Sequence, residues 1–142
     1  NTHSKLNCIF ACIQAAKAQA DEALMLDPHG FVATCNSTHF FIVRDGEVWT
    51  SSGDFCLDGI TRRNVIQVCK QHGVPVFEKN FSLADVYAAD EAFITGTFAG
   101  LTPVSEVDGR TIGAGKQQLT SQLEQYYMQL IEQDHQRASN PL

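Results

Sequence analysis

The sequence predicts an α+β (mixed α/β) fold in which a mixed sheet, or a pseudo-barrel, is flanked by helices. Short apolar runs typical of strands are mixed with amphipathic helical patterns, without the regular alternation of a doubly wound fold. Asp45-Gly46 and Asp108-Gly109 predict tight hairpins, because glycine accepts the positive φ that such turns need. The 142 residues, 44% of them hydrophobic, suit a single compact domain over residues 1–142.

Six runs rich in β-branched, aromatic and other apolar residues predict strands. In chain order they lie at 22–26, 31–34, 39–43, 48–50, 74–77 and 91–95. The turn residues Asp27-Pro28-His29-Gly30 separate the first two runs. A further hairpin is expected within 104–112.

Apolar residues at helical spacing predict three helices. The first covers 6–20, and we expect it to pack on the sheet. The second begins with Thr61 as its N-cap and ends near His72, because Gly73 stops it. The third covers 116–132, and the chain after Asp134 is expected to be frayed. A short helical turn is expected at 82–85.

Composition limits the possible partners and compartment. The net charge of −6 comes without a basic stripe, so nucleic acid is not an expected partner. No run approaches the ~18 apolar residues of a membrane span. Five cysteines without a CxxC pair predict free thiols and a cytoplasmic location. Because Asn1 leads almost directly into a helical pattern, we expect a small upstream domain to precede this one.

Two segments have the chemistry of a phosphate-binding site. At 57–62, Gly59 leads into a helix start, where backbone N–H groups meet the positive end of the helix dipole and the Thr61 hydroxyl. At 95–100, a buried strand ends in small residues, including Gly96 and Thr97, which can form a second anion-binding concavity. Each segment alone is equally compatible with an ordinary helix cap or a strand-ending turn.

The order of these segments resembles the class IV (fold-type IV) pyridoxal-phosphate-dependent aminotransferases. This family includes branched-chain and D-amino acid aminotransferases and aminodeoxychorismate lyase. The resemblance covers roughly Lys5 to Gly113 and is most specific at GITR, 59–62, and at ADEAFITGTFAGLTPVSEVDG, 89–109. It implies that residues 1–142 form the larger C-terminal, cofactor-binding domain of a homodimeric enzyme. The active site would lie between this domain and the upstream one.

The resemblance also implies residue roles. Lys5, the only lysine before the first helix, would form a Schiff base with pyridoxal 5'-phosphate and move the substrate α-proton. The N–H groups of Thr97 and Phe98 would lie near the substrate carboxylate. The cofactor-binding residues would be Lys5, Thr34, Gly59, Ile60, Thr61, Gly96 and Thr97.

Two positions depart from the family pattern. Lys5 precedes Asn7 by two residues, where the family usually has three or four, and Ser4 occupies the three-residue spacing. Thr34 stands where the family commonly places a glutamate beside the pyridine nitrogen. A threonine can hydrogen-bond that nitrogen but supplies no countercharge, so we expect weaker carbanion stabilisation.

The function that we expect is transamination between an amino acid, with branched-chain L-amino acids as first choice, and a 2-oxo acid. Alternatives are a D-amino acid aminotransferase or an aminodeoxychorismate lyase-like enzyme, and a non-catalytic domain that retains the fold. No metal is expected, because Cys8 and Cys12 lack the tighter cysteine pair usual in zinc sites. His39 is interpreted as a satisfied core or interface histidine. Trp49, Phe40 and Tyr127 are candidate interface aromatics by residue type.

Overall fold

The structure is a computed structural model that describes residues 5–97 and 100–139. It contains the mixture of helices and strands that the sequence predicts. The elements, in chain order, are α1 (Leu6–Lys17), β1 (Leu24–Leu26), β2 (Val32–Cys35), β3 (His39–Arg44), β4 (Glu47–Thr50), α2 (Ile60–Gln71), β5 (Val76–Glu78), α3 (Leu83–Tyr87), β6 (Glu91–Gly96), β7 (Gly100–Pro103), β8 (Glu106–Val107), β9 (Arg110–Thr111), a 3₁₀ turn (Gly113–Gly115) and α4 (Gln118–Ser139).

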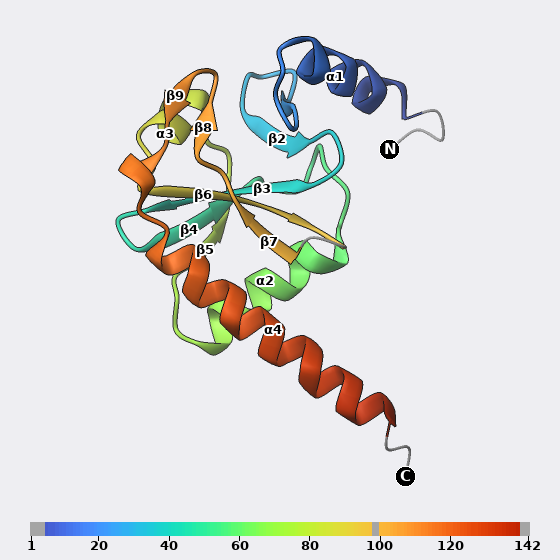
Figure 1. Cartoon of the computed structure of the whole chain (residues 1–142), viewed down its shortest axis with the longest axis vertical. Coiled ribbons are helices and arrows are strands. Elements are labelled where there is room, and N and C mark those ends of the chain that lie inside the picture. Colours follow the sequence, from blue (N-terminus) through green and yellow to red (C-terminus); the bar gives the residue numbers. More distant parts are fainter. Residues whose placement is uncertain (1–4, 98–99, 140–142) are drawn as a thin grey trace.

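The main sheet is mixed, and its strand order is β5-β4-β3-β6-β7. Strands β4 and β5 are parallel, whereas the other neighbouring pairs are antiparallel. In Figure 1, α2 and α4 lie on one side of this sheet, and α3 with the β8–β9 hairpin lies on the other. Strands β1 and β2 form a separate antiparallel pair. The predicted mixed sheet flanked by helices is therefore confirmed.

The two predicted Asp-Gly hairpins are present. Asp45 and Gly46 have φ values of 51° and 78°, and they join β3 to β4. Asp108 and Gly109 have φ values of 51° and 75°, and they join β8 to β9. Two successive residues with positive φ give the turn twist that matches paired antiparallel strands.

The alternation of side chains along β3 divides the core into two layers. Phe41 and Val43 face α2 and α4, whereas Phe40 and Ile42 face the opposite side. Phe41 stacks on Phe93 of β6, with ring centroids 4.9 Å apart. This packing sets the position of β3 relative to β6, and the candidate site lies where the same two strands continue.

The helices differ in part from the predicted ones. Helix α1 ends at Lys17, and Ala15 is its one buried residue. The expectation that this helix packs closely on the sheet is therefore wrong. Helix α4 extends through the predicted frayed region to Ser139. Its amino end is held by Glu91, whose carboxylate accepts 2.8 Å hydrogen bonds from the Leu119 and Thr120 amides. Among the described helices, none combines the length and the apolar character needed to cross a membrane.

Candidate active site

The amino end of α2 presents backbone donors that have no partner among the described residues. Helix α2 begins at Ile60, its N-cap is Gly59, and no side chain caps it. The amides of Ile60, Thr61 and Arg62 have no hydrogen-bond acceptor within residues 5–97 and 100–139. The prediction that Thr61 is the N-cap is therefore wrong, because Thr61 lies in the first turn and is buried. The first turn of α2 contains no acidic residue, so no side chain of that turn neutralises the positive end of the helix dipole.

Gly59 is required for space rather than for backbone conformation. Its φ of −73° and ψ of 139° are accessible to any residue. A Cβ atom at this position would lie 2.4 Å from Nε2 of His39, a distance that real atoms do not tolerate. The glycine therefore allows His39, at the start of β3, to approach the first turn of α2.

The end of β6 meets the same place. His39 and Thr95 are directly opposite in the β3–β6 ladder, so both side chains project from the sheet face that carries α2. Gly96, the next residue, is close to the turn before β3, because a Cβ there would lie 3.3 Å from Cγ2 of Thr38. Thr97 follows β6 and is exposed. Phe98 lies outside the described residues.

Thr34 lies on β2 and contacts the turn that carries Thr38. Its hydroxyl donates a 2.9 Å hydrogen bond to the Thr38 carbonyl. Glu22 holds this turn from outside, since its carboxylate accepts from the Ser37 amide at 2.8 Å and from the Thr38 hydroxyl at 2.8 Å. The hydroxyl oxygen of Thr34 keeps its acceptor capacity for another group.

Burial and two neighbouring charges act on the pKa of His39. Burial lowers the pKa of His39 below its ordinary value of 6.5, and the nearby Arg62 guanidinium lowers it further. Asp58 opposes this shift by favouring the protonated ring. The Asp58 carboxylate is itself paired with Arg63 at 2.9 Å, and both of these side chains are largely exposed.

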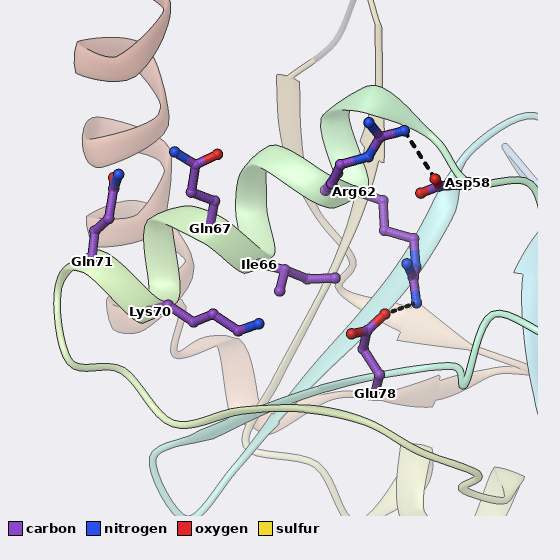
Figure 2. Close-up of a pocket in the computed structure, with 8 residues that line it drawn as sticks. Asp58, Arg62, Ile66, Gln67, Lys70, Gln71 and Glu78 are labelled. Carbon is purple, nitrogen blue, oxygen red and sulfur yellow. Dashed lines mark hydrogen bonds and ion pairs between the residues drawn. The ribbon is translucent and has the colours of Figure 1, made fainter.

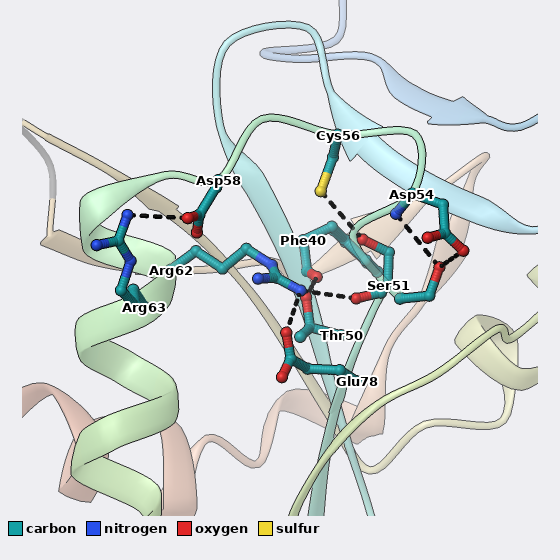
Figure 3. A network of polar contacts seen from close by, with 10 residues as sticks. Phe40, Thr50, Ser51, Asp54, Cys56, Asp58, Arg62, Arg63 and Glu78 are labelled. Carbon is teal, nitrogen blue, oxygen red and sulfur yellow. Dashed lines mark hydrogen bonds and ion pairs between the residues drawn. The ribbon is translucent and has the colours of Figure 1, made fainter.

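Arg62 is a structural arginine rather than a free anion ligand. Figure 3 shows its guanidinium between strand β4 and Glu78, away from the helix axis. Its Nη2 donates 2.8 Å hydrogen bonds to the Ser51 carbonyl and to Oε1 of Glu78. The side chain of Arg62 is 6% exposed, whereas that of Glu78 is 44% exposed. These bonds attach the first turn of α2 to the ends of β4 and β5.

A groove of about 590 Å³ runs along the outer side of α2 and does not coincide with the predicted cofactor residues. Figure 2 shows the side chains of Gln67, Lys70 and Gln71 along it. Arg62 and Glu78 form one wall, and neither Gly59 to Thr61 nor the end of β6 lines it. In the described part of the chain, no three His, Cys, Asp or Glu side chains are grouped to hold a metal ion.

Lys5 lies apart from the other predicted residues. It is the N-cap residue of α1, has a left-handed backbone with φ 46°, and is exposed. Within the described ranges, its side chain makes no hydrogen bond or ion pair with another residue. In Figure 1, α1 and α2 lie on opposite sides of the segment formed by β2 and β3. The assignment of Lys5 stays a prediction.

The structure thus brings most of the predicted cofactor residues to one place but leaves Lys5 outside it. Free amides at α2, the end of β6 and the Thr34 turn surround His39. These donors fit a phosphate monoester, because they have no protein partner in the described part of the chain and the first turn of α2 contains no carboxylate. Sequence reasoning missed the place of His39 and Glu22. Gly59 indicated that another group could lie close to the backbone there, but the sequence did not identify that group as His39.

Comparison with known proteins gives the same family. The sequence model of the family of class IV amino-transferases matches residues 1–107 of the 142 residues in this chain. A branched-chain-amino-acid aminotransferase of Pseudomonas aeruginosa is 43% identical over 127 residues, which cover 89% of this chain and 41% of that protein. A D-alanine aminotransferase of Listeria monocytogenes is 37% identical over 130 residues, which cover 89% of this chain and 45% of that protein.

Solved structures agree with the sequence relatives. The T.th. branched-chain amino acid aminotransferase complexed with N-(5'-phosphopyridoxyl)-L-glutamate has a TM-score of 0.84 at 39% identity, covering 88% of this chain and 42% of that chain. The Escherichia coli branched-chain amino acid aminotransferase has a TM-score of 0.85 at 32% identity, covering 89% and 43%. The chain spans less than half the length of these relatives. Since the family model matches most of its residues, this chain belongs to the class IV aminotransferases.

Proposed function

We propose that this chain is the larger, cofactor-binding domain of a pyridoxal-phosphate-dependent aminotransferase. One observation carries the proposal: in a member of this family, the uncapped amino end of α2 and the end of β6 meet around His39. Two solved structures of one relative support the cofactor, because they carry N-(5'-phosphopyridoxyl)-L-glutamate and pyridoxamine 5'-phosphate. The cofactor ring, when bound, supplies an electron sink for the substrate α-carbon.

The residues of this chain would divide the work as follows. The amides of Ile60 and Thr61, with the hydroxyls of Thr61 and Thr97, would bind the phosphate. Gly59 and Gly96 would lie beside it and leave room for His39 and Thr38. Each charge-assisted hydrogen bond to the phosphate contributes about 1.5–3 kcal/mol. The amides of Thr97 and Phe98 would hold the substrate carboxylate. The amine of Lys5 would attach the cofactor covalently and move the α-proton.

Thr34 would contact the pyridine nitrogen in place of the usual glutamate. Because its hydroxyl proton is donated to the Thr38 carbonyl, the Thr34 oxygen faces other groups as an acceptor. An acceptor favours the protonated nitrogen, but a neutral oxygen does so less strongly than a carboxylate. We therefore infer that the chain keeps cofactor binding and has weaker carbanion stabilisation than a glutamate-bearing relative.

Branched-chain L-amino acids and their 2-oxo acids are the proposed substrates. The support is the group of branched-chain aminotransferases among the relatives, which includes proteins at 43% and 46% identity. D-alanine aminotransferases are also relatives, at 37% identity, so D-amino acid transamination is the second candidate. Product analysis with L-leucine and D-alanine separates the two, since only one of them should yield its 2-oxo acid at a substantial rate.

A spectroscopic experiment tests the cofactor and the lysine together. The protein is mixed with pyridoxal phosphate, and its visible absorption is recorded before and after borohydride reduction. We expect a reducible band in the wild type and in Lys17→Ala, a matched control in the last turn of α1, but not in Lys5→Ala. A band that survives in Lys5→Ala would place the attachment on another lysine. No band in any variant would favour the non-catalytic alternative.

Two variants test the phosphate site. Thr61→Ala and Thr97→Ala should each weaken cofactor retention, measured by dialysis against buffer followed by absorption. Thr102→Ala is the control, because Thr102 lies on β7 away from α2 and is exposed. If neither Thr61→Ala nor Thr97→Ala changes retention, the phosphate is bound elsewhere.

We also propose a cytoplasmic homodimer. Five free cysteines support a reducing compartment. The exposed apolar side chains of α1, namely Leu6, Ile9, Phe10 and Ile13, support a covering subunit or upstream domain. Of the three candidate interface aromatics, Phe40 and Tyr127 are buried in the core, whereas Trp49 is half-buried. Light scattering after size-exclusion chromatography tests the dimer, and a monomer at micromolar concentration would contradict it.

A further inference from the structure

A buried hydroxyl without a partner marks the sheet surface next to α2. Thr95 is 1% exposed, and its Oγ1 has no hydrogen-bond partner among the described residues. Buried hydroxyls are normally paired, so such a group indicates a ligand or water that completes the site. Thr95 and Phe93 are two residues apart on β6, and Phe93 packs in the core layer that includes α2. The unpaired hydroxyl therefore lies on the α2 side of the sheet.

His39 lies beside this hydroxyl and takes the place of a capping side chain. In an ordinary N-cap, an oxygen attached to Cβ accepts from the amides of the first helical turn. Gly59 has no Cβ, and Nε2 of His39 lies 2.4 Å from the position that a Cβ would have. The imidazole reaches this position from the start of strand β3. It makes no hydrogen bond with a described residue.

The charged groups that act on the imidazole both come from the segment that begins α2. Arg62 disfavours its protonation and Asp58 favours it, whereas β6 presents the uncharged hydroxyl of Thr95 opposite His39. Burial adds to the effect of Arg62 and lowers the pKa of the ring. A dianion at the amino end of α2 would reverse this balance, because its charge favours the imidazolium.

We propose that His39 is a further ligand of the anion bound at the amino end of α2, and that it binds this anion more tightly when protonated. The proposal rests on the proposed function, and it assigns to His39 a role that none of the sequence motifs indicated. The ligand class is a phosphate monoester or another tetrahedral dianion. Affinity for such an anion then increases as the pH falls through the pKa of His39 in the complex.

Sulfate is a suitable probe, since it stays a dianion between pH 5 and 8. Binding is measured by calorimetry across this range, and the His39 ring is titrated by NMR with and without sulfate. A rise of one unit in the pKa of His39 corresponds to about tenfold tighter binding at the acidic end. We expect this gain in the wild type and in His72→Gln, a control at the other end of α2, and its loss in His39→Gln.

Two results would overturn the inference: a His39 titration that sulfate does not move, or equal pH dependence of sulfate binding in His39→Gln and the wild type. The NMR result does not depend on a variant that folds. The proposed function fails separately, through the absence of a visible band with pyridoxal phosphate. A band together with an unmoved His39 titration refutes only this inference. A moved titration without a band supports the anion site and refutes the enzyme.

Discussion

Helices α1 and α2 each contain 12 residues and an apolar stripe, but they differ in what covers that stripe. Helix α2 packs Val65, Val68 and Cys69 against the sheet and α4, and each of them is at most 1% exposed. Helix α1 leaves Ile9 and Phe10 about half exposed. The periodicity of a sequence predicts that a helix has an apolar face, but another element must be present to bury it.

This difference explains where the candidate site is well formed. The anion donors at the start of α2 are held by Arg62 on one side and by the β3–β6 pair on the other. Lys5 precedes α1, which has few partners among the described residues, so its position is not determined in the same way.

Thiol reactivity should differ most strongly between the helices. Burial raises the pKa of Cys69 in α2 to about 12, whereas Cys12 in α1 is exposed. From a starting value of 9.0, the shift lowers the thiolate fraction of Cys69 about a thousandfold at pH 8, and burial blocks access as well. Alkylation followed by peptide mass spectrometry should label Cys12 far faster. Equal labelling in the native state would mean that α2 opens readily, and unfolding in urea should abolish the difference.

Removal of an aromatic ring should matter on the α2 side of the sheet and not on α1. Phe93 is fully buried against Phe41, so Phe93→Ala should lower the free energy of unfolding by about 3–5 kcal/mol. Phe10 is 56% exposed, and Phe10→Ala should change the free energy of unfolding by less than about 0.5 kcal/mol in this chain. Urea denaturation measures both. A large loss in Phe10→Ala would show that α1 is packed in solution.

Arg62 should contribute more than its neighbour on the same helix. Arg62→Met leaves the buried Ser51 carbonyl without its donor, so we expect a loss of about 1–3 kcal/mol in stability. Arg63→Met is the matched control, because the Arg63–Asp58 pair is exposed and such pairs contribute about 0–1 kcal/mol. The result to compare is the urea midpoint at constant m-value. Equal midpoints for the two variants would contradict a structural role for Arg62.

The smallest expected effect is a pH dependence of stability from His39. Its pKa is lowered in the folded chain, so the unfolded chain binds more protons between that value and 6.5. Stability from this group is therefore fully present above 6.5 and is lost as the pH falls through the folded pKa. His39→Gln should flatten this part of the stability profile. An unchanged profile would mean that His39 is solvated in the folded state.

The sequence predicted the fold class, both Asp-Gly hairpins and the two segments that meet at the site. Those features depend on local chemistry, such as the φ of Asp45 and Gly46 or the glycine that precedes the first turn of α2. It did not predict the proximity of His39 to Gly59 or the role of Glu22 in the turn at 36–38. These contacts join residues distant in sequence, and they depend on the register of β3 against β6. The lack of cover over α1 was likewise not visible in its own periodicity.

The parallel pairing of β4 and β5 has a consequence for folding. The two strands are neighbours, yet the chain between them includes the whole of α2. Strand β4, helix α2 and strand β5 therefore form one crossover unit, which contains the anion donors at the start of α2. The long connection between β4 and β5 must close before these two strands can pair. We expect the amides of α2 and β5 to exchange hydrogen together, as one cooperative unit, and α1 to exchange faster. Anion binding at the start of α2 should also slow exchange at β5, because Arg62 joins that turn to Glu78 at the end of β5.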